Sequence, residues 1–109
     1  MDHLTITLLE KMFRETTPEE MLRRQFVGKE VSVWEMEVIK PLQNKGLSDS
    51  VINVLLQYVA ELHGKLERQH VLEVGASWAK QKVQTTKKAM CLVDDQIKHK
   101  YLQIYGVES

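Results

Sequence analysis

Hydrophobic side chains recur every three or four positions along most of the chain, which is the spacing of one face of an α-helix. No stretch alternates regularly between polar and apolar residues, so no strand is predicted. Short connections between the periodic stretches are typical of a compact bundle. The pattern therefore predicts an all-α bundle of five to six short helices, over about 4–14, 17–28, 33–44, 49–63, 67–82 and 85–104.

Capping residues support several of these boundaries. Thr17 is a suitable N-cap, Pro18 suits the first helical position, and Glu20 completes a capping box. Ser48 is the expected N-cap of the fourth helix. Pro41 lies inside the third helix and is expected to kink or restart it.

The apolar stripe over residues 51–62 is too broad for a surface helix and predicts the centre of the core. In the next helix, His70, Val74 and Trp78 recur every four residues and share one face. Gly75 beside them suggests close approach by a neighbouring helix. Two readings of Trp78 stay open here, a core anchor and a partly exposed aromatic edge.

Composition limits the number of domains, the disulfide content and the cellular location that we expect. A chain of 109 residues fits one domain, and one cysteine, Cys91, excludes an intramolecular disulfide. We expect that thiol to be a buried small hydrophobe. No signal peptide and no run of ~20 apolar residues is found, so a cytoplasmic protein is predicted.

Catalytic and metal-binding patterns are missing from the sequence. There is no nucleophile motif and no glycine-rich phosphate loop, and the four histidines lie at no metal-ligand spacing. We therefore expect a binding protein and not an enzyme, with no cofactor, no metal and no small-molecule substrate.

Charge is balanced overall but not along the chain. The net charge is zero, with 15 basic and 15 acidic residues, yet Lys80, Lys82, Lys87 and Lys88 surround one turn without an acid between them. Thr85 in that turn can cap the last helix, and a helix N-terminus favours a phosphate. Two interpretations remain: a phosphate-backbone site and a solvated, lysine-rich surface.

Further residues would extend such a site. Lys98 and Lys100 can add phosphate contacts if the last helix extends along the bound nucleic-acid strand. Trp78 could stack on a base if it is not fully buried, and Tyr101 or Tyr105 are alternatives.

Four stretches match a known pattern: T-P-E-E-M-L-R-R at 17–24, V-I-N-V-L-L-Q-Y-V at 51–59, G-K-L at 64–66 and S-W-A-K-Q-K-V-Q-T-T-K-K-A-M at 77–90. Together they resemble the C-terminal domain shared by the DnaD and DnaB replication-initiation proteins of low-GC Gram-positive bacteria. This DnaB is the helicase-loading and membrane-attachment protein, and the DnaB version fits better than DnaD. The family's Tyr-x-x-x-Ile-x-x-x-Trp signature falls on His70, Val74 and Trp78, so the tyrosine is replaced here.

The resemblance implies binding of single-stranded or partly duplex DNA, self-association, and contacts with primosome proteins such as the helicase loader and a DnaD-like protein. It also implies a nucleoid location, with membrane association in the full-length protein. We expect residues 1–16 to form an N-terminal helix or leader, 17–93 the domain and 94–109 an extension of the last helix and tail. The whole is expected to be either an excised C-terminal domain, which we favour, or a short relative. The alternative function is a protein–protein adaptor without direct DNA contact, which zero net charge favours.

Overall fold

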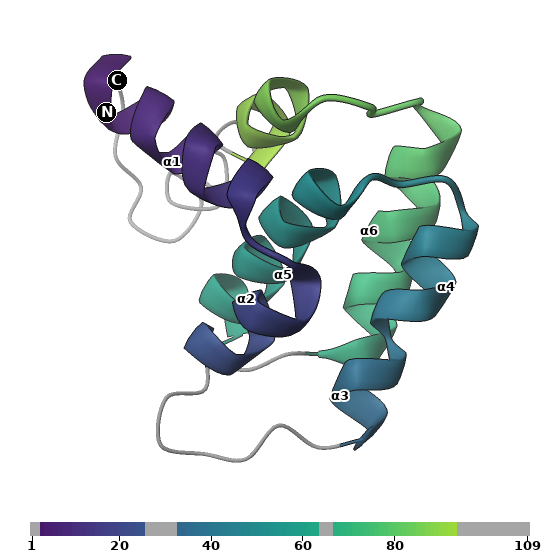
Figure 1. The fold of residues 1–109 in the computed structure, drawn as a ribbon. Coiled ribbons are helices and arrows are strands. Elements are labelled where there is room, and N and C mark those ends of the chain that lie inside the picture. The colour runs from purple at the N-terminus through teal and green to yellow at the C-terminus, as the bar shows by residue number, and fades with distance from the viewer. Residues whose placement is uncertain (1–2, 26–32, 64–66, 94–109) are drawn as a thin grey trace, which may run out of the picture.

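The computed structural model describes residues 3–25, 33–63 and 67–93, and these are helical almost throughout (Figure 1). Residues 86–93 form a further helical segment, called the final helix below. No strand occurs in the described ranges, so the predicted all-α bundle is confirmed. The helices that precede it are α1 (His3–Glu15), α2 (Pro18–Gln25), α3 (Val33–Glu37), α4 (Ile39–Asn44), α5 (Asp49–His63) and α6 (Arg68–Lys80).

Helix α5 lies at the centre of the bundle, in contact with α1, α2, α4 and α6 (Figure 1). Every residue from Val51 to Leu56 is buried. Full burial of each large apolar side chain stabilises the fold by about 1.5–3 kcal/mol relative to exposure. The prediction that this broad apolar stripe forms the centre of the core is therefore confirmed.

The predicted helix over 33–44 is divided into α3 and α4 at Val38. A proline has no N–H, so Pro41 cannot donate to the carbonyl of Glu37, four residues earlier. Helix α3 ends at that carbonyl, and Pro41 lies in the first turn of α4. The expected interruption of this helix is confirmed, and the break lies one turn before Pro41.

Two predicted helix starts are also confirmed. The Thr17 hydroxyl accepts the N–H of Glu20 at 3.2 Å and donates to the Glu20 carboxylate at 3.2 Å, and α2 begins at Pro18. The Ser48 carbonyl accepts the N–H of Ile52 at 2.9 Å, which makes Ser48 the residue that precedes α5.

Helix α1 is joined to the core near its C-terminal end. Phe13 is buried, and Leu9 and Met12 pack against the same cluster. The buried Asn53 amide of α5 donates to the backbone carbonyls of Phe13 and Thr16 at 2.9 and 2.6 Å. These bonds satisfy carbonyls that a helix end leaves without partners.

Gly75 lies where α6 crosses α4. A Cβ atom at this position would overlap a methyl carbon of Leu42 and would touch Leu55 of α5. The predicted close approach of a neighbouring helix is confirmed, because any larger residue at this position would require the Leu42 side chain to shift.

The expectation for Cys91 was wrong, since its side chain is exposed. In the final helix Thr86 and Ala89 are buried and Val93 is partly buried, at a spacing of three to four residues. Cys91 falls between these positions, on the opposite side of a helix with 3.6 residues per turn.

Candidate nucleic-acid interface

The turn that follows α6 has the geometry of a Schellman motif. The N–H of Val83 donates to the carbonyl of Trp78 at 3.0 Å, and the N–H of Lys82 donates to that of Ala79 at 3.1 Å. The backbone of Lys82 itself adopts the left-handed conformation, with φ = 57°. Glycine is the usual residue at this position, and a side chain there is strained.

Two buried side chains hold the turn against the core. Val83 and Trp78 are each 1% exposed, and a hydrophobic contact of this kind commonly accompanies a Schellman motif. The ring of Trp78 therefore has no face accessible to a nucleotide base. The condition for its stacking role is not met, and the structure supports the alternative, in which Trp78 anchors the core.

The start of the final helix is fixed by two hydroxyl groups. The Thr85 hydroxyl accepts the N–H of Lys88 at 3.1 Å, so Thr85 is the predicted N-cap. The buried Thr86 hydroxyl donates to that of Ser50, at the beginning of α5, over 2.7 Å. The helix end that the sequence left open for a phosphate is thus partly occupied by Thr85.

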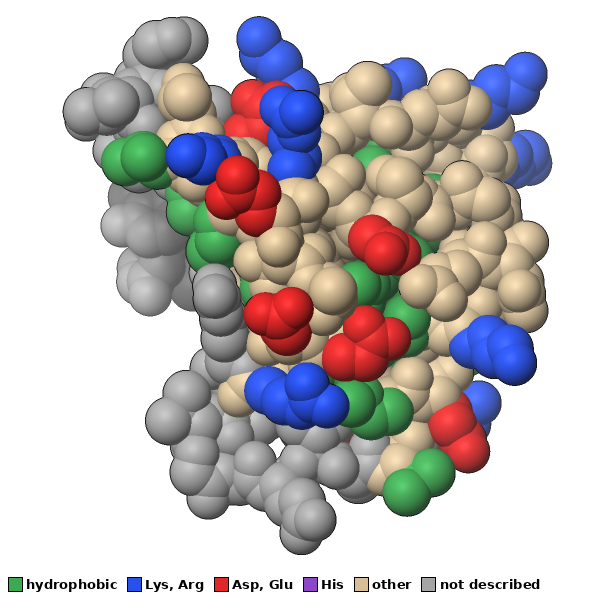
Figure 2. Space-filling model, in the orientation of Figure 1, with side chains coloured by type: hydrophobic (Ala, Val, Ile, Leu, Met, Phe, Trp, Pro, Cys, Tyr) green, Lys and Arg blue, Asp and Glu red, His purple; other side chains and the backbone are tan. Residues whose placement is uncertain are grey.

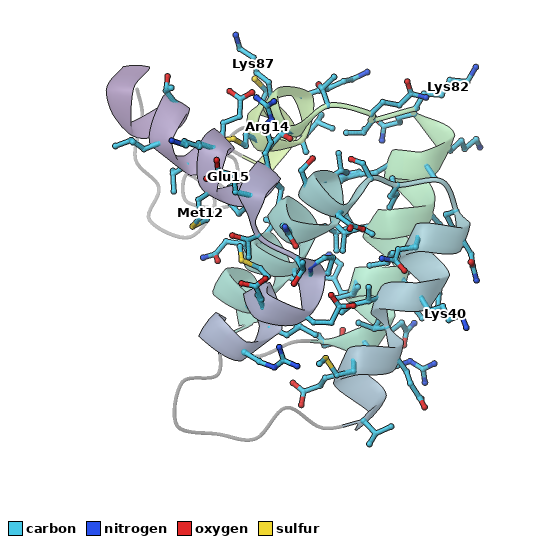
Figure 3. All side chains as sticks on the ribbon, in the orientation of Figure 1. Met12, Arg14, Glu15, Lys40, Lys82 and Lys87 are labelled. Carbon is cyan, nitrogen blue, oxygen red and sulfur yellow. The ribbon has the colours of Figure 1, made fainter. Side chains whose placement is uncertain are left out.

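The four lysines of this region lie at one end of the molecule, and all four side chains are exposed. Figure 3 shows Lys82 and Lys87 pointing away from the bundle there, and Figure 2 shows basic side chains along the same edge. No ion pair joins the four to a described carboxylate. Their charge is therefore available to an anionic partner, and we call Lys80, Lys82, Lys87 and Lys88 the lysine surface.

The other predicted contact residues cannot be placed on this surface. Lys98 and Lys100, like Tyr101 and Tyr105, lie outside the residues that the structure describes.

The signature positions occupy the side of α6 that faces the core. Val74 is partly buried and Trp78 fully so. His70 packs edge-on against Tyr58 of α5, with ring centroids 6.1 Å apart and planes at 65°. Burial raises the pKa of the Tyr58 phenol. This face therefore joins α6 to α5, and His70 contributes a ring contact at the position of the family's tyrosine.

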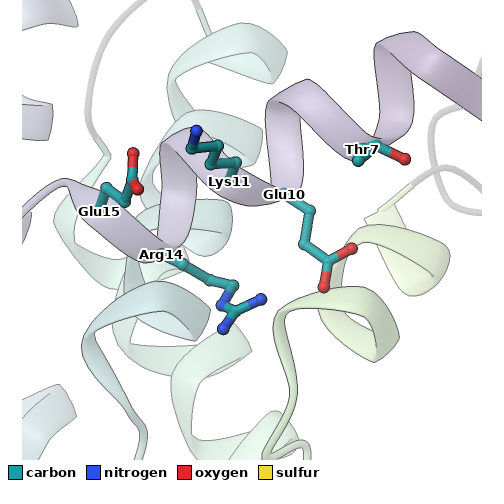
Figure 4. A pocket seen from close by; sticks show the side chains of 5 residues that line it. All are labelled: Thr7, Glu10, Lys11, Arg14 and Glu15. Atoms are coloured by element: carbon teal, nitrogen blue, oxygen red, sulfur yellow. The ribbon is translucent and has the colours of Figure 1, made fainter.

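One basic residue near the lysine surface could not be identified as a candidate contact residue from the sequence. Arg14 of α1 points toward the final helix (Figure 4), the helix that carries Lys87 and Lys88. It lines a hollow of about 460 Å³ on the side of α1, together with Thr7, Glu10, Lys11 and Glu15 (Figure 4). Its proximity follows from the packing of α1, which no local pattern reveals.

Within the described ranges, no group of three or more His, Cys, Asp or Glu residues is arranged to hold a metal ion. In the same ranges, no helix has both the length and the apolar character needed to cross a membrane.

The described residues thus form a small all-α domain with an exposed basic turn and a buried aromatic face. Comparison with protein families is more specific. The family model for replication initiation and membrane attachment matches residues 20–91, about two thirds of the chain. The chain belongs to this DnaB-type family, which confirms the resemblance seen in the sequence. No curated protein and no solved structure matches it.

Proposed function

We propose that this chain is a replication-initiation module that binds single-stranded or partly duplex DNA non-specifically through the lysine surface. Family membership supports the role in replication initiation. The observation that carries the DNA-binding part is the exposure of four lysines around one turn, without ion pairs to described carboxylates. Lysine contacts with phosphates give affinity that is independent of sequence and falls with salt.

The strain at Lys82 supports the same assignment. A left-handed lysine is less stable than a glycine at this position, and strained residues that persist tend to cluster at functional sites. Its backbone conformation orients the side chain away from the bundle, at the end where Lys87 also projects (Figure 3).

The module acts by binding and positioning, not by catalysis, and needs no cofactor. In this role it contacts DNA together with other primosome proteins, such as the helicase loader and a DnaD-like protein. We place it at the nucleoid in the cytoplasm, with membrane association as a property of the full-length protein.

The DNA-binding assignment is tested by replacing Lys80, Lys82, Lys87 and Lys88 with glutamate. Binding of a labelled single-stranded oligonucleotide, followed by fluorescence anisotropy, should disappear while the helical circular dichroism spectrum is retained. A control variant carries glutamate at Arg23, Lys40 and Arg68, three exposed cations outside the lysine surface, and should still bind. Unchanged binding by the lysine variant would refute the assignment.

A protein–protein adaptor is the second candidate. Zero net charge favours it, because dedicated DNA-binding domains are usually basic overall. A pull-down with purified primosome proteins, at salt high enough to suppress DNA binding, separates the two functions. Capture under those conditions, by a chain that does not bind an oligonucleotide at low salt, would establish the adaptor.

A further inference from the structure

The lysine surface does not end at the final helix, because α1 brings another cation to its edge. The last turn of α1 is held rigidly by Asn53, which is 0% exposed. Its amide donates to the carbonyls of Phe13 and Thr16, on either side of Arg14 in the sequence. With Phe13 buried in the core, the backbone around Arg14 is fixed relative to α5.

The Arg14 side chain is exposed and extends from α1 toward the final helix (Figure 4). In Figure 3 both Arg14 and Lys87 lie on the side of the molecule where α1 and the final helix are found. Glu10, one helical turn earlier, points in the same direction, but no ion pair joins Arg14 to a described carboxylate. The N–H groups of the guanidinium are thus available to a ligand in the open hollow.

We propose that Arg14 binds a backbone phosphate of the same DNA strand that contacts Lys87 and Lys88. This inference rests on the proposed function and extends its surface to α1, a helix outside the matched residues 20–91. A guanidinium presents a planar set of donors that can hold a phosphate through two parallel hydrogen bonds. Lysines at the turn supply point charges, and Arg14 adds a directional contact at one edge.

The test compares Arg14→Gln with Lys40→Gln, which removes one exposed charge from α4, away from the lysine surface (Figure 3). Both are titrated into a labelled oligothymidylate of roughly 20 nucleotides at several salt concentrations. We expect Arg14→Gln to weaken binding about three- to tenfold and to make the salt slope shallower by about 0.7, the value for one phosphate on a single strand. Lys40→Gln should match the unaltered chain.

A third variant, Arg14→Lys, keeps the charge but loses the planar donor set. It should retain the salt slope and recover only part of the affinity. Equal binding by Arg14→Gln and Lys40→Gln, with binding lost in the four-lysine variant, would overturn the role of Arg14 and leave the proposed function intact. Full binding by the four-lysine variant would overturn both.

Discussion

Lys82 combines an unfavourable backbone conformation with an exposed charge. It is the one non-glycine residue with positive φ in the described part of the chain, and it closes the turn after α6. A Cβ atom in the left-handed region costs about 1 kcal/mol, which glycine avoids. The binding role proposed for Lys82 is therefore separable from its effect on stability.

Lys82→Gly should therefore change stability and binding in opposite directions. We expect the free energy of unfolding to rise by about 0.5–1 kcal/mol, because the strain is relieved, while oligonucleotide affinity falls. Urea denaturation and anisotropy measure the two effects. Gly46→Ala is the matched control: Gly46 has φ = 91° with open space around it, so alanine should lower stability by a similar amount without affecting binding. A less stable Lys82→Gly variant would contradict this account.

Asn53 is a second residue whose role is set by its surroundings. Its amide lies among apolar side chains of α5 and donates to two carbonyls at the end of α1, while its Oδ1 has no partner among the described residues. Asn53→Leu would leave both carbonyls without these donors, and we expect a loss of about 2–4 kcal/mol in urea denaturation. Replacing Gln69, whose amide donates to Glu73 on the exposed side of α6, should change stability by less than about 0.5 kcal/mol. Equal effects at the two sites would refute the role of Asn53.

At the scale of elements, α6 connects the core to the lysine surface. Its buried side carries Val71, Gly75 and Trp78; Lys80 is its last residue, and Lys82 lies in the turn that follows. The crossing with α4 at Gly75 sets how closely α6 can approach the rest of the bundle. The position of the turn therefore depends on this crossing.

Gly75→Ala tests the crossing directly. Alanine is favoured over glycine in a helix by about 1 kcal/mol, but here its Cβ would overlap Leu42. We expect overpacking to dominate and stability to fall by about 1–3 kcal/mol. Combining Gly75→Ala with Leu42→Ala should lower stability by less than the sum of the single changes, because the smaller side chain makes room. A stabilised Gly75→Ala variant would show that the crossing is loose.

Most elements of the fold could be predicted from the sequence, because their signals are local. Helical periodicity, the Thr17 cap and the proline in 33–44 each act within a few residues. The position of the break was less predictable, since the effect of Pro41 falls on the carbonyl four residues earlier. Cys91 was misjudged because an apolar run on a short helix does not reveal which side faces the core.

The candidate site could be predicted only in part. The lysines around the turn are neighbours in sequence, so their clustering was evident. Burial of Trp78 depends on how α6 packs in the bundle. Arg14 is more than 70 positions from Lys87, and its position beside the final helix follows from the docking of α1 on α5.

At the scale of the whole molecule, the net charge is zero but the basic and acidic side chains are unevenly distributed over the surface. Basic side chains gather along one edge, and most acidic side chains on the face in Figure 2 lie away from it. At physiological ionic strength, charges separated by more than about 8 Å are largely screened from one another. A basic edge can therefore bind an anionic strand although the protein as a whole is neutral.

The central claim is tested most directly by the salt dependence of single-stranded oligonucleotide binding to the unaltered chain. Phosphate contacts by the four lysines predict that the logarithm of the association constant falls linearly with the logarithm of salt concentration, with a slope of about −3, and the proposed contact of Arg14 makes the slope steeper by about 0.7. Binding that is absent at low salt, or that does not change with salt, would contradict a lysine surface that binds DNA.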